Sequence, residues 1–367
     1  MEKSDNMRFI RKVTNADIAV CDKADSFLQS SLWGAFKSCF GWTARAFMID
    51  WTQYGERPLL TLCRRLAPGI SFAYIPWGPE LPDGFPEDPV ERSLALSELC
   101  AALRPFLPKS AAFIRIDPPW YSRGADAPPP VLLKPFLRSA ADVQTPDTVI
   151  LNIDRSEEEI LAGMKSQWRY NQRMALKRGL VISRTDEAGI GAFYSLLRET
   201  AGRTGIAIHS EDYYKTLFEH FYNFRQSKGS GADLRLYQAE HEGEVLAAMI
   251  ILHWNATAVY LYAASSDHKR NLMPSFALKI HAILDAHSSG CVNYDLFGIP
   301  PNDDPSHPMA GLFRFKTGFG GEIIHRPGCW DYLCRPFTAK LFRTAEALRK
   351  KIRDSKKIRS HKRGSQN

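Results

Sequence analysis

Three short apolar runs near the start of the chain are separated by turn residues, a pattern typical of β-strands. They cover residues 45–51, 59–66 and 71–77, with the turn sequences QYG at 53–55 and PG at 68–69 between them. A helical spacing of apolar residues follows at about 90–103, and the run FIRID at 113–117 ends at two prolines. The pattern therefore predicts a meander of three strands, then a helix, then a fourth strand.

The same order of elements returns in the second half of the chain. Residues 233–239 and 245–254 flank a Glu242-Gly243 turn, and residues 258–264 form a third run. A helix at about 275–287 and a strand at 292–295 complete the series. No repeat is visible at the level of single residues, so the duplication is one of architecture. It predicts an α/β (α+β) chain with two mixed sheets and a domain boundary near Pro146.

The composition fits a globular protein and excludes several classes. The 367 residues include 44% hydrophobic and 24% charged residues, enough apolar material for about two cores. The seven cysteines are odd in number and form no C-x-x-C pair, which suits a reducing compartment and gives no zinc module or other metal site. The N-terminus is too polar for a signal peptide, and polar residues interrupt the most apolar stretch at 247–264. We therefore expect a soluble cytoplasmic protein.

The positive charge is concentrated at the C-terminal end. The formal net charge is +8, but residues 340–367 alone hold 11 basic and 2 acidic residues, which leaves residues 1–339 with a net charge of −1. Within this tail an apolar stripe at helical spacing is formed by Leu341, Ala345, Leu348 and Ile352. Such a helix could lie on an anionic membrane surface, bind the phosphates of a nucleic acid, or dock on its own domain with a disordered basic end.

A second basic feature is a predicted helix over residues 157–178. Ser156 and Glu159 have the spacing of a capping box, and Gly179 ends the pattern. Four cations follow one another at steps of four residues on one face of this helix, namely Lys165, Arg169, Arg173 and Lys177. Like charges at this spacing repel, so an anionic partner such as a phosphate group or a nucleic acid would stabilise the face. The alternative is an ordinary solvated helix face.

The order of meander, helix and strand resembles the core of GCN5-type acyltransferases. Those enzymes hold the pyrophosphate of coenzyme A on a glycine-rich loop at the start of the helix. In this chain the equivalent stretch, DHKRNLMP at 267–274, has no glycine, and its proline lacks an N–H donor. We therefore do not expect coenzyme A to bind.

Several segments resemble the FemABX aminoacyltransferases, and they occur in the same order. They are FLQSSLWGAFK at 27–37 with GW at 41–42, YIPWGP at 74–79, KRG at 177–179, RTGI at 203–206 with Tyr213-Tyr214, YDLFGI at 294–299 and GLFRFKTGFGGE at 311–322. The last segment is the most specific. Together the segments extend over almost the whole chain except the tail.

The resemblance implies an enzyme of cell-wall synthesis. It would move glycine, alanine or serine from aminoacyl-tRNA to an amino group on the stem peptide of a UDP-linked or lipid-linked muropeptide, forming the interpeptide bridge. The tRNA ester is already activated, so no cofactor is expected.

The resemblance also implies two GCN5-like domains, at 1–147 and 148–319, with the first completed by about 320–340 and a tail at 341–367. Only about twenty residues separate Tyr214 from the strand at Leu234, which is typical of the compact form without a coiled-coil arm. We expect a monomer, and the tail leaves open a peripheral contact with an anionic inner membrane.

Three residues carry the expected chemistry. The resemblance makes Lys316 the catalytic lysine, beside Phe315, where a desolvated ammonium can stabilise a developing oxyanion. The alternative is a surface lysine on a glycine-rich strand. Asp117 matches an acidic residue that has been considered the proton acceptor, and proton loss assisted by the substrate is its competitor.

Four further residues match positions that bind the precursor in the family. Lys37 matches a lysine that contacts the diphosphate, with an exposed lysine as the alternative. His209 and Tyr213 stand where some members have an arginine and a tyrosine for the uridine diphosphate. Histidine lacks the fork and the permanent charge of arginine, which leaves a lipid-linked precursor open. Tyr262 is a further candidate, or a tyrosine of the sheet core, and we expect a structural role for Asp295.

Two other functions compete with this interpretation. A coenzyme A-dependent N-acyltransferase is disfavoured by the loop at 267–274. A non-catalytic RNA-binding module would use the basic helix but would not need Phe315 and Lys316 beside Gly318 and Gly320.

Overall fold

The computed structural model describes residues 9–228, 231–307 and 309–364, with side chains as far as Lys351. The chain divides into two compact units. The first contains residues up to 122, residues 128–146 and the C-terminal part from 325 onward, and the second contains residues 123–127 and 147–324. None of the helices in the described ranges combines the length and the apolar character needed to cross a membrane.

The first unit is built on a mixed sheet of seven strands in the order β1-β2-β3-β4-β5-β15-β7. Its strands are β1 (Ile10–Asn15), β2 (Trp42–Trp51), β3 (Gly55–Ala67), β4 (Ile70–Ile75), β5 (Ala111–Ile116), β7 (Leu137–Arg138) and β15 (Trp330–Leu333). The pair β4 and β5 is parallel, and its crossover contains α2. The helices are α1 (Ser31–Ser38), α2 (Pro89–Leu103) and α9 (Pro336–Gly364), with short 3-10 turns at Ile18–Lys23, Phe27–Gln29 and Arg104–Phe106.

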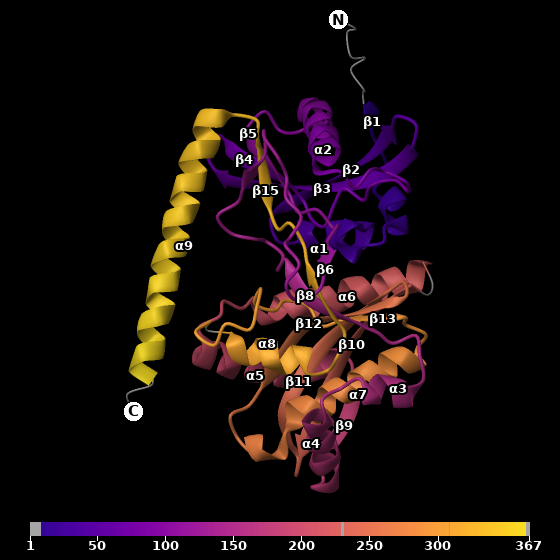
Figure 1. Cartoon of the computed structure of the whole chain (residues 1–367), viewed down its shortest axis with the longest axis vertical. Coiled ribbons are helices and arrows are strands. Elements are labelled where there is room, and N and C mark those ends of the chain that lie inside the picture. Colours follow the sequence, from indigo (N-terminus) through magenta and orange to yellow (C-terminus); the bar gives the residue numbers. More distant parts are fainter. Residues whose placement is uncertain (1–8, 229–230, 308, 365–367) are drawn as a thin grey trace, which may run out of the picture. The chain divides into compact units, whose positions relative to one another are not determined.

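A strand from the end of the chain completes this sheet. β15 pairs with β5 on one side and β7 on the other, and Figure 1 shows it beside β4 and β5. The buried Arg115 of β5 donates two hydrogen bonds to Asp331 of β15 and two to Glu346 of α9. A buried guanidinium is costly unless its donors are satisfied, so this pairing ties the C-terminal segment to the first unit.

The second unit has a mixed sheet of eight strands in the order β6-β14-β8-β13-β12-β11-β10-β9. Its strands are β6 (Ser122–Arg123), β8 (Asp147–Asn152), β9 (Val181–Thr185), β10 (Ala232–His241), β11 (Glu244–Trp254), β12 (Thr257–Ser265), β13 (Asn293–Asp295) and β14 (Glu322–His325). Its helices are α3 (Glu157–Ala162), α4 (Ser166–Lys177), α5 (Ile190–Thr204), α6 (Glu211–Lys228), α7 (Pro274–Ser288) and α8 (Ala310–Thr317), with 3-10 turns at Glu187–Gly189 and Arg270–Leu272.

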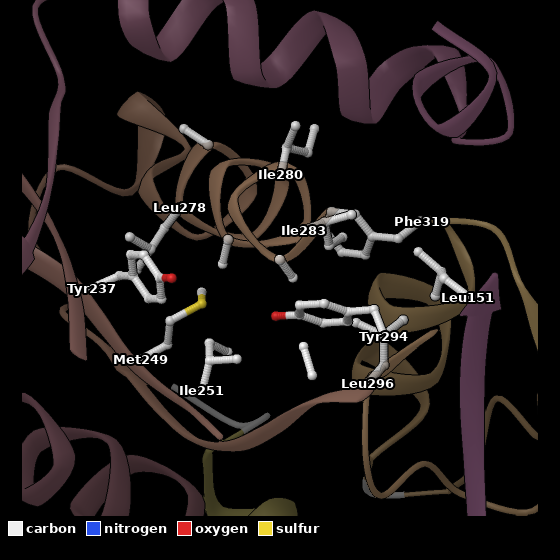
Figure 2. Close-up of a cluster of buried hydrophobic side chains, with 14 of the residues drawn as sticks. Leu151, Tyr237, Met249, Ile251, Leu278, Ile280, Ile283, Tyr294, Leu296 and Phe319 are labelled. Carbon is white, nitrogen blue, oxygen red and sulfur yellow. The ribbon is translucent and has the colours of Figure 1, made fainter. Parts of the chain in front are cut away.

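The core of the second unit lies between this sheet and helix α7. Figure 2 shows Leu278 and Ile283 of α7 gathered with side chains from the strands, among them Tyr237 and Tyr294, while Ile280 points to the other side of the helix. α7 buries most of its surface, which explains why its sequence is apolar all round rather than on one face. Leu296 and Ile299 of the loop after β13 belong to the same cluster, so this packing also fixes the position of that loop.

The α/β fold with two mixed sheets is confirmed, and the order of strands and helix that the sequence predicts is present in both units. The prediction of one helix over residues 157–178 is wrong. Gly163 ends α3 and α4 begins only at Ser166, because the N–H of Lys165 donates to the carbonyl oxygen of Gly318 instead of continuing the helix. The compact form is also confirmed, since α6 leads directly to β10 with no inserted arm.

Candidate functional site

Lys316 lies near the end of α8 and is almost completely buried, with 5% of its surface exposed. Its ammonium donates to the carbonyl oxygens of Phe297 and Gly298 at 2.7 and 3.0 Å. Nζ also lies 4.9 Å from the ring centre of Tyr260. Burial lowers the pKa of Lys316 to about 7, and the carboxylate of Asp295 opposes this change. The lysine is a desolvated group on a helix, so the alternative of a surface lysine on a strand is wrong.

The two carbonyl groups that hold Lys316 belong to a turn fixed by Asp295. This buried carboxylate accepts hydrogen bonds from the hydroxyl of Thr148 at 2.5 Å and from the N–H of Phe297 at 2.8 Å. Phe297 has a φ of 53°, in the left-handed region that residues with a Cβ rarely adopt. Such a backbone persists only where its surroundings hold it. Asp295 therefore positions the acceptors of Lys316 through the backbone.

The glycines after Lys316 allow other elements to approach closely. A Cβ at Gly318 would lie 2.4 Å from the indole of Trp168, and one at Gly320 would lie 2.8 Å from the carbonyl oxygen of Gly163. Gly320 also has a φ of 85°, which favours glycine. The glycine pattern of the 311–322 segment is therefore explained by packing against α4 and the end of α3.

Phe315 contributes to the site through packing. Its ring lies 5.1 Å from that of Phe276 and 5.0 Å from that of Phe319, both nearly perpendicular. Trp168 joins this cluster, and its indole N–H donates to the carbonyl oxygen of Phe315 at 3.0 Å. Edge-to-face contacts of this kind stabilise aromatic clusters beyond the area they bury. The cluster holds α8, and thereby Lys316, against α4 and α7.

A second buried lysine, Lys279 on α7, was missed by the sequence analysis. It has no exposed surface, and its Nζ lies over the ring of Tyr260, the same ring that Lys316 faces. Within the described part of the chain, no hydrogen-bond partner reaches this Nζ. Burial lowers the pKa of Lys279 well below its ordinary value, and the charge of Lys316 lowers it further. The available signal was a lone cation inside the apolar run FALKIHAIL at 276–284.

Asp117 directly follows β5 in the first unit and is buried. Its carboxylate accepts a hydrogen bond from the hydroxyl of Tyr74 at 3.1 Å. Burial raises the pKa of Asp117 to about 7, and the negative charge of Asp142 adds to the rise, whereas Tyr74 and Arg326 oppose it. A carboxyl group with such a pKa can accept a proton near neutral pH.

The two N-terminal segments of the resemblance meet around Asp117. The side-chain amide of Gln29 donates to the carbonyl oxygen of Pro76 at 2.7 Å. Its own Oε1 accepts a hydrogen bond from the N–H of Leu60 at 2.9 Å. The N–H of Gly78 in turn donates to the carbonyl oxygen of Asp117 at 3.0 Å. The segments at 27–37 and 74–79 thus form one buried structure, although 36 residues separate them along the chain.

Lys37 lies on α1 and is half-buried beside aromatic rings. Its Nζ is 5.4 Å from the ring centre of Trp33 and 5.8 Å from that of Phe36. Burial lowers the pKa of Lys37 to about 8, and the charge of Arg64 lowers it further. Two neighbouring cations on a partly desolvated surface favour an anionic group. The alternative of a fully exposed lysine is therefore wrong.

His209, Tyr213 and Tyr262 come together in the second unit. The rings of His209 and Tyr213 are stacked with centres 3.8 Å apart and an angle of 11°. Burial raises the pKa of Tyr213 to about 12, and a hydrogen bond with Tyr262 opposes the rise. His209 is exposed, whereas Tyr213 is buried and Tyr262 is half-buried. The three residues form one aromatic cluster, which His209 extends to the surface.

The basic stripe is shorter in the structure than in the sequence. Lys165 precedes α4, and Arg169 turns inward to donate to the carbonyl oxygens of Leu161 and Met164 at 3.0 and 2.6 Å. Arg169 thus caps the end of α3, as cations commonly do at helix C-termini. Exposed cations on α4 itself are Arg173 and Lys177, with Lys165 beside its start.

The loop at 267–274 is occupied by ion pairs within the protein. Lys269 pairs with Glu242 at 3.0 Å and with Glu244 at 3.3 Å, while Asp267 pairs with Arg203 at 2.7 Å. In the described ranges, no group of three His, Cys, Asp or Glu residues is arranged to hold a metal ion. The loop at the start of α7 therefore offers neither a glycine-rich cradle nor an uncompensated cation to a pyrophosphate.

Comparisons with known proteins agree with these motifs. The lipid II:glycine glycyltransferases of Staphylococcus saprophyticus and Staphylococcus aureus are each 22% identical to this chain. The alignments cover 90% and 96% of this chain and 92% and 96% of those proteins. The crystal structure of FemX matches with a TM-score of 0.72 and 17% identity over 90% of this chain and 100% of that chain, so the two share a fold.

The family model described as the FemAB family matches residues 137–228 and 226–347. These segments cover more than half of the chain and include the loop after β13 and the whole of α8. The resemblance inferred from the motifs is thus confirmed, and the chain belongs to the FemAB family.

Proposed function

We propose that the protein transfers an amino acid from aminoacyl-tRNA to an amino group on the stem peptide of a peptidoglycan precursor. The relatives' names describe glycyl transfer to lipid II, which makes glycine the first amino acid to test and a lipid-linked muropeptide the first acceptor. The aromatic cluster of His209, Tyr213 and Tyr262 supports the same choice, because it lacks the fixed charge that a nucleotide diphosphate would favour.

The observation that carries the proposal is the environment of Lys316. An ammonium has three N–H donors, and the carbonyl oxygens of Phe297 and Gly298 accept two of them. The third can donate to an oxyanion in a site of low dielectric, where such a bond is strongest. An acyl transfer to an amine needs this stabilisation when the ester carbonyl becomes tetrahedral.

In the proposed reaction the amine nitrogen of the acceptor attacks the ester carbonyl carbon, and a new C–N bond forms. The C–O bond to the ribose then breaks, and the amine proton ends on the released hydroxyl. Asp117 is our proposed acceptor of that proton, since its raised pKa suits transfer near neutral pH. Direct proton transfer within the substrates is the alternative.

For the tRNA we propose contact through the exposed cations of α4, Arg173 and Lys177, together with Lys165. Reversing the charge of Arg173 and Lys177 should weaken tRNA binding and flatten its dependence on salt, because fewer counterions are released. Reversing Arg169 would instead uncap α3, so it is unsuitable for this test. If the salt dependence of tRNA binding is unchanged in the R173E/K177E protein, these cations belong to an ordinary solvated helix face.

A coenzyme A-dependent N-acyltransferase is the second candidate that the fold class suggests, but no observation favours it. Lys269 and Asp267, just before α7, are paired with Glu242 and Arg203, and the start of α2 is capped by the carboxylate of Asp88. A capped helix start such as that of α2 has fewer free N–H groups for a phosphate, and Pro274 at the start of α7 has none to offer.

The deciding experiment is a transfer assay with the full chain. Labelled glycyl-, alanyl- and seryl-tRNA are each offered with a lipid-linked or a UDP-linked muropeptide, and acetyl-coenzyme A replaces the tRNA in a parallel reaction. We expect amide product from one aminoacyl-tRNA, and preference for the lipid-linked acceptor. Product from acetyl-coenzyme A alone, or no product from any aminoacyl-tRNA, would contradict the proposal.

A further inference from the structure

Helix α9 is fixed to the first unit by one of its faces. The ring of Phe342 stacks on that of Phe113 with centres 5.5 Å apart, and Ala339 is fully buried. Glu346 pairs with the buried Arg115 at 2.8 Å, and Lys350 donates to the carbonyl oxygen of Ala140 at 2.8 Å. These positions recur every three to four residues, so they form one stripe along the helix.

The opposite face of α9 carries large apolar side chains that are exposed. Phe337 is 94% exposed, Leu341 is 71% exposed and Leu348 is 58% exposed. Their spacing of four and seven residues places them in a second stripe, about half a turn from the docked one. The side chain of Ile352, the fourth member of the stripe predicted from the sequence, lies outside the described residues. We call Phe337, Leu341 and Leu348 the outer stripe.

Cations lie on both sides of the outer stripe. The helical spacing of 100° per residue places Lys340 and Lys351 on one flank and Arg349 on the other, and all three are exposed. The acidic Glu346 belongs to the docked face, where Arg115 neutralises it. The outer side of α9 is therefore apolar along its centre and positive at its edges, in a segment whose net charge from residue 340 onward is +9.

We infer that α9 is a membrane-docking helix whose outer stripe inserts at the surface of an anionic lipid bilayer. Helices that lie in the plane of a membrane surface have this combination of an apolar centre and Lys or Arg flanks. Anionic head groups would pair with the flanking cations while Phe337, Leu341 and Leu348 enter the acyl region. Since one face is anchored to the first unit, the helix would hold the whole protein at the bilayer.

Two other occupants fit these observations less well. A second copy of the chain would place two segments of charge +9 against each other, which opposes association. RNA would pair with the cations and could stack a base on Phe337, but it gives the side chains of Leu341 and Leu348 no apolar phase to enter. The inference does not depend on the proposed transfer reaction, because membrane binding is measured without any substrate.

The test is flotation of the full chain with vesicles of phosphatidylcholine alone or with roughly one third phosphatidylglycerol, an anionic lipid. We expect the protein to float with the anionic vesicles only, and less so at high salt. The F337Q/L341Q/L348Q variant should lose at least about tenfold in its partition coefficient. The K340E/R349E variant should lose a similar factor while keeping the outer stripe.

The matched control is V90Q/L94Q, which changes two half-exposed apolar residues of α2 in the same unit. It should bind vesicles as the wild type does. Circular dichroism and the melting temperature show that each variant is folded, and truncation of α9 is avoided because the helix packs on the sheet. Equal binding by the outer-stripe variant would overturn the inference. Two other results would also overturn it. One is a wild-type dimer that the outer-stripe variant no longer forms, and the other is tRNA binding that requires the outer stripe in a protein that does not bind vesicles.

Discussion

The first unit buries a carboxyl group and the second buries an ammonium, and burial shifts the pKa values of both groups toward the same pH. The pKa of Asp117 rises to about 7, and that of Lys316 falls to about 7. In each case the loss of water disfavours the charged form, and a neighbour opposes the shift. Tyr74 donates to the carboxylate of Asp117, while two carbonyl oxygens accept from Lys316.

The difference between the two groups lies in the charges around them. Asp117 has the like charge of Asp142 nearby, which favours its neutral form and outweighs the opposing charge of Arg326. Lys316 instead has the opposite charge of Asp295, which favours its charged form. The first environment suits a group that takes up a proton, and the second suits a cation that stays protonated beside a developing anion. Four sets of variants test this comparison.

The largest effect is expected for Lys316→Met. Losing a preorganised donor to an oxyanion should lower kcat by roughly 100- to 1,000-fold, with a much smaller change in KM. Single-turnover transfer rates measure this directly. The control is Arg314→Gln, which removes an exposed cation from the same helix and should leave the rate nearly unchanged. Wild-type turnover in the methionine variant would remove Lys316 from the mechanism.

Asp117→Asn should lower the rate at pH 7 by roughly 100-fold if Asp117 accepts the proton. It should also abolish the limb of the pH profile that rises through about pH 7, because that limb reports ionisation of the carboxyl group. Tyr74→Phe sharpens the test. It removes a hydrogen bond that lowers the pKa of Asp117, so the limb should move to higher pH. A variant D117N with an unchanged profile would favour proton transfer within the substrates.

Asp295→Asn removes a charge but keeps an oxygen that can accept from Thr148 and Phe297. The rate should fall by about tenfold. The pKa of Lys316 should fall, so the limb of the profile that declines with rising pH should move to lower pH by up to about one unit. The control Thr148→Val removes a hydrogen bond to Asp295 but keeps its charge, so this limb should stay in place. A limb that moves in both variants or in neither would show that the charge of Asp295 does not act on Lys316.

The smallest effect concerns stability. Lys279→Met replaces a buried amine that has no hydrogen-bond partner among the described residues, so the free energy of unfolding at pH 7 should rise by about 1 kcal/mol. Because the pKa of Lys279 is lowered in the folded state, the unfolded chain binds more protons below the ordinary lysine pKa. The free energy of unfolding of the wild type should therefore rise with pH between the lowered pKa and the ordinary one. That of the variant should rise less over the same range.

Urea unfolding at several pH values measures both effects of Lys279→Met. Lys177→Met, at an exposed position on α4, should change neither the stability nor its slope with pH. A destabilised K279M protein would mean that the amine makes a favourable interaction in the core.

Local patterns in the sequence predicted the three-strand meander, the helix and the following strand of each unit, because alternating and helical spacings are local properties. The break at Gly163 was missed because it is set by Gly318 and Gly320, which lie far along the chain. The inward turn of Arg169 was missed for the same reason, since carbonyl groups of α3 are its partners. The motif indicated Lys316, but only the fold reveals that Asp295 acts on it through the backbone of Phe297.

The placement of β15 has a consequence for how the chain folds as it is synthesised. β15 lies between β5 and β7 in the first sheet, yet it is made after every strand of the second. The unit that begins first is therefore finished last, and until then β5 presents an unpaired edge of the kind that promotes aggregation. All strands and helices of the second sheet and its unit have been made by residue 325, so the second unit can fold before the first one closes.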